Sequence, residues 1–341
     1  MKSEKILFIY TNMSSFVKED LKILESQYKV SLFRFKLNKP HQIFISYFQE
    51  FFLLLFSIWK YQKIYIWFGD YHTILPIFFS KITGKKSYLV VGGYDACRIK
   101  ELKYGSFKNP IRGFMTKYSM NHCSLNLCVS KYVERKVKWI APKSSRTLLY
   151  NALPTQGITV SAQKKENLIL TVGIAYSEKR IILKGFDIFV TIAKNMPEHL
   201  FMIVGCDRDV LERVCGKLPL NLSVYPILKK NELTLFYQKA KIYCQFSVIE
   251  SFSMTLAESM LYNCIPIITN VGGMPEVIGN CGYIVNKKDP EFLMQHIKKA
   301  YSDDIKEDPH KQILKYFTIQ QRANALLHIL KSDKSTYTTH N

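Results

Sequence analysis

Short apolar runs alternate along the chain with segments whose apolar residues recur every three to four positions. The runs are typical of buried strands, and the periodic segments are typical of amphipathic helices. Because helical segments separate successive runs, the strands are expected to be parallel. The predicted strands are 5–10, 28–35, 64–68, 86–91, 125–129, 147–150, 168–172, 200–204, 222–226, 241–246, 266–269 and 282–285.

The predicted strands fall into two similar halves joined by a polar segment, 154–166. This organisation predicts an α/β protein of two doubly wound, Rossmann-like domains, residues 1–153 and 154–317. Ligands of such sheets bind beyond the carboxyl ends of the strands. With two sheets face to face, we expect the functional site in a central cleft.

One stretch, 43–59, is unusually dense in Phe, Ile and Leu. It contains Gln49 and Glu50 and falls short of the ~20 residues that span a membrane comfortably. It is interpreted either as a buried helix of the first domain or as an interfacial helix that docks on a membrane. A transmembrane helix is a third alternative.

Charge is concentrated in the first half of the chain. Residues 1–150 carry 25 Lys and Arg against 9 Asp and Glu, a net charge of +16, and the whole chain carries +21. Such an excess predicts contact with a polyanionic surface or with acidic substrates. The charge alone leaves nucleic acid and an anionic membrane leaflet as alternatives.

The eight cysteines show no paired spacing, and several lie in apolar runs. They are therefore expected to be reduced residues of a cytoplasmic protein. No secretory signal is expected, because the segment 6–10 is too short for the apolar region of a signal peptide. The histidines are scattered along the chain, and this distribution predicts no metal site.

Two carboxylates, Glu250 and Glu258, flank the beginning of a predicted helix. Glu250 follows the strand 241–246, and Glu258 lies about two turns into the helix. The N–H groups of 253–256 lie between them, and free N–H groups at a helix start bind anions. Considered separately, each carboxylate would be interpreted as a solvated residue on the surface of a helix. Together they predict a site for a nucleotide sugar, with N–H groups for the diphosphate and carboxylates for hydroxyl groups.

Two further segments carry candidate site residues. Lys184 and Gly185 directly precede a predicted helix, after a strand that ends at Gly173. Lys184 is expected to offer its charge to a diphosphate, and Gly185 to let a ligand approach the backbone. In the first half, Asp95 follows a glycine pair at a strand end. Asp95 is expected either to contact a sugar or to cap a turn.

The segment 247–276 resembles the donor-sugar signature of family 4 retaining glycosyltransferases of the GT-B fold, the glycosyl transferases group 1. The family pattern is Ser-x-x-Glu-Gly-Phe-Gly-x-x-x-x-Glu-Ala-Met, followed by an apolar strand and Gly-Gly-x-x-Glu. The loop glycines of the pattern are replaced here by Ser251 and Ser253. The matching residues are Ser247, Glu250, Phe252, Glu258, Met260, Gly272, Gly273 and Glu276.

The resemblance implies transfer of a sugar from a UDP- or GDP-linked donor, with retention and without a metal or other cofactor. The implied acceptor is a glycan or lipid-linked molecule, in the synthesis of cell-surface polysaccharide or lipopolysaccharide. The expected partners are the nucleotide sugar, this acceptor and an anionic membrane surface, but not nucleic acid. The protein is expected in the cytoplasm, peripheral on the inner face of the membrane, with the last helix, 318–331, packing back on the first domain.

The resemblance also assigns roles to residues. The implied catalytic residues are Glu250, Lys184 and Asp95. Glu250 would position the donor sugar and Lys184 would neutralise the diphosphate. Asp95 lies near the position where many family members have a histidine that contacts the donor sugar. Glu258 would bind the ribose. Arg180 is the nearest substitute for the diphosphate-binding arginine of the family. The remaining donor-binding residues implied are Gly173, Gly185, Ser251, Phe252, Ser253, Met254, Thr255 and Leu256.

Two alternatives stay open. The first is a sugar-nucleotide epimerase of the same fold, which would need acid–base residues in the cleft. The second is a non-catalytic partner subunit, which the missing loop glycines would allow. The intact pair of Glu250 and Glu258, together with Lys184, favours the transferase.

Overall fold

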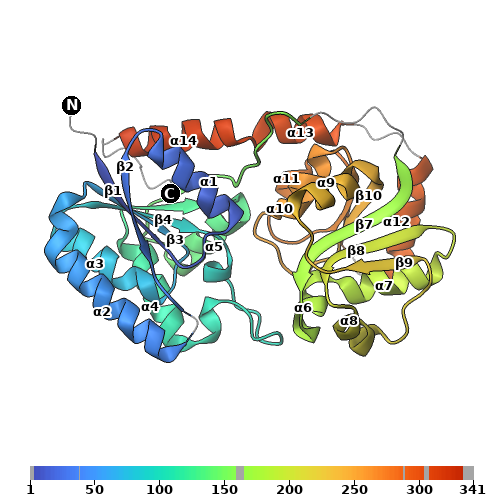
Figure 1. The fold of residues 1–341 in the computed structure, drawn as a ribbon, viewed down its shortest axis with the longest axis horizontal. Helices are drawn as coiled ribbons and strands as arrows, with labels where there is room; N and C mark the ends of the chain where they lie inside the picture. Colours follow the sequence, from blue (N-terminus) through green and yellow to red (C-terminus); the bar gives the residue numbers. More distant parts are fainter. Residues whose placement is uncertain (1–3, 38, 159–164, 287–288, 303–306, 333–341) are drawn as a thin grey trace. The chain divides into compact units, whose positions relative to one another are not determined.

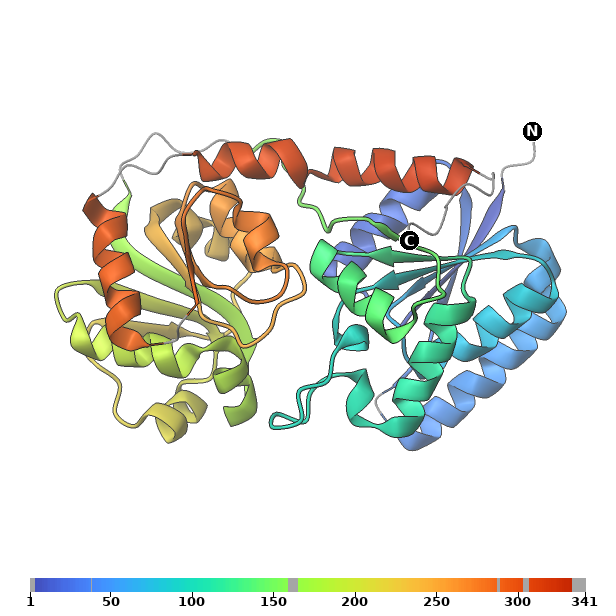
Figure 2. The same cartoon turned by 180° about the vertical axis from the view of Figure 1, so that it is seen from behind.

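The computed structural model of the protein describes residues 4–37, 39–158, 165–286, 289–302 and 307–332. Each of its two units is an α/β structure (Figures 1 and 2). One unit comprises Met1–Asn151 and Ile319–Asn341, and the other Ala152–Thr318. This division falls two residues before the boundary predicted from the sequence. Of the predicted polar segment 154–166, residues 159–164 lie outside the described residues.

The first unit is built on a parallel six-stranded sheet with the order β2-β1-β3-β4-β5-β6. Its strands are β1 (Lys5–Tyr10), β2 (Lys29–Arg34), β3 (Lys63–Trp67), β4 (Lys86–Val91), β5 (Leu125–Cys128) and β6 (Arg146–Leu148). Its α-helices are α1 (Ser15–Glu25), α2 (Pro40–Ser57), α3 (Ile74–Ile82), α4 (Pro110–His122), α5 (Lys131–Ile140) and α14 (Ile319–Lys331). Every residue of β3 is buried, as expected for a central strand of a sheet covered on both faces.

The second unit repeats this architecture with the order β12-β11-β10-β7-β8-β9, again parallel. Its strands are β7 (Glu166–Ala175), β8 (Leu200–Cys206), β9 (Leu222–Tyr225), β10 (Ala240–Gln245), β11 (Ile265–Thr269) and β12 (Tyr283–Val285). Its helices are α6 (Glu178–Lys184), α7 (Phe186–Asn195), α8 (Arg208–Cys215), α9 (Lys230–Lys239), α10 (Met254–Leu261), α11 (Met274–Ile278), α12 (Pro290–Ser302) and α13 (Pro309–Tyr316). All the predicted strands are present, and the two-sheet α/β fold is confirmed.

A buried ion pair joins α14 to α1 within the first unit. Arg322 donates from Nε to Asp20 Oδ1 at 2.6 Å and from Nη2 to Asp20 Oδ2 at 2.8 Å. Tyr65 and Trp67 also donate to Asp20 Oδ2, at 2.6 and 3.0 Å. Arg322 further donates to the carbonyl oxygen of Leu149 at 2.9 Å. Because the charges are paired and hydrogen-bonded, the side chains tolerate near-complete burial, at 2% and 0% exposure.

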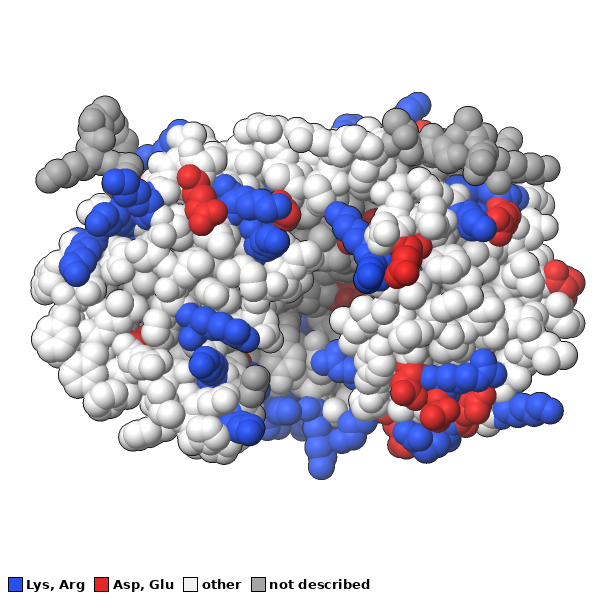
Figure 3. Space-filling view, in the orientation of Figure 1, with Lys and Arg blue, Asp and Glu red and all other residues white. Residues whose placement is uncertain are grey.

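Helix α2 buries only a narrow stripe. The stripe consists of Ser46, Glu50 and Leu54, spaced one turn apart. The opposite side exposes large apolar side chains, which we call the α2 apolar face: Phe44, Ile45, Phe48, Phe51, Phe52, Leu55 and Phe56. The surface over α2, at the lower left of Figure 3, is almost bare of charged side chains. The helix therefore has one side on the core, and its other side is exposed.

By length and composition alone, Pro40–Lys60 is the one helical segment among the described residues that is long and apolar enough to cross a membrane. Only 22% of its most apolar window is buried. The buried stripe, however, includes Glu50, and burial raises the pKa of this carboxyl. Helix α2 thus contacts the core of the first unit through this stripe, which includes the buried Leu54.

Candidate active site

The candidate site lies in the second unit, beyond the carboxyl end of β10 and at the beginning of α10. Its central residue, Glu250, is held through its backbone by the glycine pair that follows β11. Gly273 donates its N–H to the Glu250 carbonyl oxygen at 3.0 Å. Gly272 has φ +62°, and a Cβ at this position would lie 1.5 Å from the same oxygen. A side chain at 272 is thus excluded, which explains why the glycine pair accompanies the carboxylate.

The side chain of Glu250 forms a cluster through one of its two oxygens. Its Oε1 accepts from Lys184 Nζ at 2.6 Å, from Gln245 Nε2 at 2.9 Å and from Ser247 Oγ at 3.2 Å. None of the described residues donates to Oε2. The carboxylate is 14% exposed and the lysine 21%. One oxygen is therefore saturated by the protein, and the other is available to a ligand.

Lys184 is the last residue of α6, a helix that the sequence did not predict. Gly173 of β7 makes room for it, because a Cβ there would lie 3.3 Å from Lys184 Cδ. Gly185 has φ +71°, and a Cβ would lie 2.2 Å from the carbonyl oxygen of Phe246. The close approach of the chain's own backbone therefore requires glycine at this position.

Ser253 caps α10 in a left-handed conformation, with φ +76°. Its Oγ donates to Gln245 Oε1 at 2.7 Å and accepts from the N–H of Leu256 at 3.4 Å. The positive φ explains why the family pattern has glycine here, and a non-glycine residue in this region costs about 1–2 kcal/mol. The two hydrogen bonds offset that cost. The cap also uses the Leu256 N–H, so Met254 and Thr255 offer the remaining N–H groups at the helix start.

Two of the implied donor-binding residues have side chains in the core. Phe252 is 1% exposed and packs its ring 5.2 Å from that of Phe317, and Leu256 is fully buried. Their side chains hold the loop and helix in place rather than contact a ligand. Ser251, Met254 and Thr255 are half-buried at the site.

Glu258 lies on α10 next to a small pocket of about 40 Å³ in the second unit. Its carboxylate accepts from the Tyr237 hydroxyl at 3.2 Å. Burial raises the pKa of Glu258, although Tyr237 and Lys230 act in the opposite direction. The pocket is lined by Leu153, Pro154, Ile158, Lys230, Leu233, Thr234, Tyr237, Glu258, Leu261 and Tyr262. The recess is mainly apolar, with Glu258 and Lys230 as its charged residues.

Gln245 is a residue of the site that the sequence reasoning missed. Its amide links Glu250 to Ser253, and its Oε1 also lies 3.3 Å from the hydroxyl of Tyr243. The available signal was a polar residue at the last position of the apolar strand β10. Such a residue points to a site because the carboxyl ends of parallel strands form the ligand-binding edge.

Asp95, expected as a catalytic group, is fully buried in the first unit. Its Oδ2 accepts from the N–H of Gly69 at 2.9 Å, and its Oδ1 from that of Gly93 at 2.6 Å. Burial raises the pKa of Asp95 to about 6, against the effect of these hydrogen bonds. The geometry corrects the expectation: Asp95 ties two loops together, the turn-capping alternative, and does not present its carboxylate to a substrate.

Arg180, expected to assist Lys184, lies on α6 with an exposed side chain. It forms no side-chain hydrogen bond or ion pair with any described residue. The structure thus brings together Lys184, Glu250, Gly173 and Ser253 from separate segments, but it does not bring Arg180 into the cluster.

Part of the chain matches a known protein family and two curated proteins. Residues 159–316 match the family Glycosyl transferases group 1. An uncharacterised glycosyltransferase of Methanocaldococcus jannaschii is 26% identical over 208 residues, which are 58% of this chain and 55% of that protein. One of Haemophilus influenzae is 27% identical over 144 residues, which are 39% of this chain and 36% of that protein. The matches thus span about half or less of these relatives.

Solved structures match over nearly the whole chain. Sucrose-phosphate synthase from Thermosynechococcus elongatus has a TM-score of 0.76 at 13% identity, covering 96% of this chain and 98% of that one. Anabaena HepE in complex with UDP and glucose also has a TM-score of 0.76 at 13% identity, covering 96% and 100%. The chain therefore has the GT-B fold, and residues 159–316 match the family model of glycosyl transferases group 1. The resemblance recognised from the sequence is confirmed at this level.

Proposed function

We propose that this protein is a retaining glycosyltransferase that uses a nucleotide-diphosphate sugar without a metal ion. The observation that carries the proposal is the cluster of Lys184 on Glu250 at the beginning of α10. It places a cation, free helix N–H groups and a carboxylate oxygen within one small site. These groups match the diphosphate and the sugar hydroxyls of a donor.

In the proposed reaction the acceptor hydroxyl attacks the anomeric carbon from the side of the leaving diphosphate. The new bond joins the acceptor oxygen to that carbon, the bond to the diphosphate oxygen breaks, and the acceptor proton passes to that oxygen. Negative charge grows on the diphosphate as it leaves. Lys184 and the N–H groups of Met254 and Thr255 would stabilise this charge, the main electrostatic task. Glu250 would hold Lys184 through Oε1 and a sugar hydroxyl through Oε2.

The donor we propose is linked to UDP. The support is indirect: the structure of HepE, which shares this fold, contains UDP and glucose. Glu258 would accept hydrogen bonds from the ribose hydroxyls at the pocket beside Tyr237. GDP is the competing choice and belongs in the same test.

Binding of nucleotides tests the proposal before any acceptor is known. At about 100 times its dissociation constant, UDP should stabilise the protein by ~2.7 kcal/mol, a readily visible thermal shift. We expect the shift to persist in EDTA and to disappear in Glu258→Ala. The control is Glu291→Ala, an exposed carboxylate at the start of α12.

Each other outcome has a definite meaning. A thermal shift with GDP but not with UDP would show that the donor carries guanosine instead of uridine. A shift that EDTA abolishes would contradict a metal-independent site. No shift with any nucleotide sugar would favour the non-catalytic subunit, and production of an epimerised nucleotide sugar without acceptor would favour the epimerase.

For the acceptor we propose a glycan or lipid-linked molecule at the inner face of an anionic membrane, in the synthesis of cell-surface polysaccharide or lipopolysaccharide. Two observations support this choice. The α2 apolar face exposes aromatic side chains that a bilayer interface would accommodate. The net charge of +16 over residues 1–150 would attract anionic lipids, at about 1 kcal/mol for each basic residue near the surface.

Replacing exposed phenylalanines of α2 tests the membrane contact. Phe48→Ser, Phe52→Ser and Phe56→Ser should each weaken binding to vesicles of phosphatidylglycerol about tenfold, because each inserted ring contributes roughly 1.5 kcal/mol. Vesicle co-sedimentation at fixed salt measures the effect. Leu220→Ser, which removes a fully exposed apolar side chain from the second unit, is the matched control. Equal binding by all four variants and the wild type would exclude α2 as the contact.

A further inference from the structure

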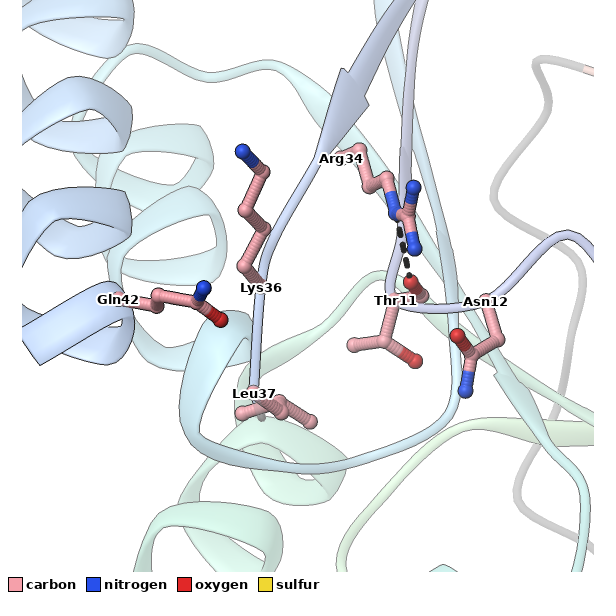
Figure 4. A pocket seen from close by; sticks show the side chains of 6 residues that line it. All are labelled: Thr11, Asn12, Arg34, Lys36, Leu37 and Gln42. Atoms are coloured by element: carbon pink, nitrogen blue, oxygen red, sulfur yellow. Dashed lines mark hydrogen bonds between the residues drawn. The ribbon is translucent and has the colours of Figure 1, made fainter. Parts of the chain in front are cut away.

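A pocket of about 240 Å³ lies in the first unit, where β1 and β2 end side by side (Figure 4). Its lining residues are Thr11, Asn12, Arg34, Lys36, Leu37 and Gln42. The carboxyl ends of parallel strands are the ligand-binding edge of such a sheet. The volume is below the ~300 Å³ at which sites for drug-sized ligands begin, so the pocket suits one small group. The donor site described above does not use it.

The charge of the pocket is entirely positive. Arg34, the last residue of β2, and Lys36 both line it, and no acidic residue does. Arg34 donates from Nε to the carbonyl oxygen of Thr11 at 3.4 Å. Neither cation forms an ion pair with any residue that the structure describes. An anion in the cavity would be attracted by both positive charges. The Arg fork and the Lys ammonium are the usual ligands of phosphate.

The neutral groups of the pocket indicate what accompanies the anion. Gln42 Oε1 is buried and has no hydrogen-bond partner among the described residues. A buried acceptor left unpaired costs free energy, so a ligand hydroxyl that donates to it would be favoured. The hydroxyl of Thr11 and the amide of Asn12 offer further hydrogen bonds. The N–H of Lys36 donates to Ser46 Oγ at 3.1 Å, which fixes this wall of the pocket to α2.

We propose that this pocket binds a phosphate ester with a neighbouring hydroxyl group, as the head of the acceptor. The identification as an acceptor site rests on the proposed function; the phosphate site itself does not. Gln42 lies in the first turn of α2, and Ile45 of the α2 apolar face lies beside it, three residues further along the same helix. A ligand whose phosphate lies in the pocket would have an apolar surface next to it for a lipid chain.

Binding of glycerol 3-phosphate and of inorganic phosphate, titrated by calorimetry at constant ionic strength, tests the proposal. Arg34→Gln and Lys36→Gln should each weaken both ligands about tenfold or more, the usual effect of losing a charge-assisted hydrogen bond. Gln42→Leu should weaken glycerol 3-phosphate, which has carbon-bound hydroxyls, more than inorganic phosphate. Lys29→Gln is the matched control, since it removes the same charge from the opposite end of β2.

The result that would overturn the proposal is equal affinity in Arg34→Gln, Lys36→Gln and Lys29→Gln, or no phosphate binding by the wild type. The shift caused by UDP should be unchanged in Arg34→Gln, which separates this site from the donor site. If the wild type binds phosphate but no nucleotide, the proposed function is wrong, whereas the proposed phosphate site is supported. If glycerol 3-phosphate competes with phosphatidylglycerol vesicles for the protein, the natural ligand is a lipid headgroup. If it does not compete, the natural ligand is a soluble sugar phosphate.

Discussion

Lys184→Ala is expected to lower the rate of sugar transfer about 10²–10³-fold, the range seen when one preorganised donor to a developing negative charge is removed. The physical reason is its placement. Glu250 Oε1 holds the ammonium group 2.6 Å away, with Gln245 and Ser247 on the same oxygen. The charge is therefore oriented before the donor arrives and needs no reorganisation when the diphosphate leaves. The loss should appear in kcat with a saturating donor.

The matched control for this prediction is Lys179→Ala, which removes an exposed lysine from the same helix, α6. It should leave transfer unchanged. Glu250→Gln should also lower kcat, and the double variant with Lys184→Ala should lose little more than either single change, because the two side chains act as one unit. Additive losses, or full activity of Lys184→Ala, would contradict a joint role of the pair.

Asp20→Ala is expected to destabilise the first unit by about 3–5 kcal/mol, because it leaves the buried Arg322 charge without its partner. This is a large part of the ~5–15 kcal/mol by which folded domains are stable. The three tryptophans, Trp59, Trp67 and Trp139, all lie in the first unit. Tryptophan fluorescence during urea denaturation therefore reports the unfolding of this unit.

Glu19→Ala is the control for Asp20→Ala. Glu19 precedes it on α1 and pairs with Lys22 at the surface, so its removal should cost at most about 1 kcal/mol. Replacing both partners, Asp20→Leu with Arg322→Met, should cost less than Asp20→Ala alone, because no buried charge is then left unpaired. Equal denaturation midpoints for Asp20→Ala and Glu19→Ala would show that the ion pair does not hold α14 to the sheet.

The secondary structure was largely predictable because its signal is local. Apolar runs bounded by turns identified all the strands of both sheets, and the helical pattern of apolar residues after Glu250 located α10. Helix α6 was missed because its seven residues are too few to establish a helical period. The exposed side of α2 was also undecidable from the sequence, since Phe and Leu occur all around that helix.

The sequence by itself determined the fold class, the family resemblance and the residue types of the candidate site. Only the tertiary structure decided which of them meet. Gly272 supports the Glu250 backbone, Gln245 joins Glu250 to Ser253, and Asp95 is buried in a turn instead of facing a ligand. The periodicity of apolar residues depends only on neighbours in the chain, so it predicts helices, strands and their buried faces. Hydrogen-bond partners and burial depend on segments far apart in sequence, which only the packing of the sheet and helices brings together.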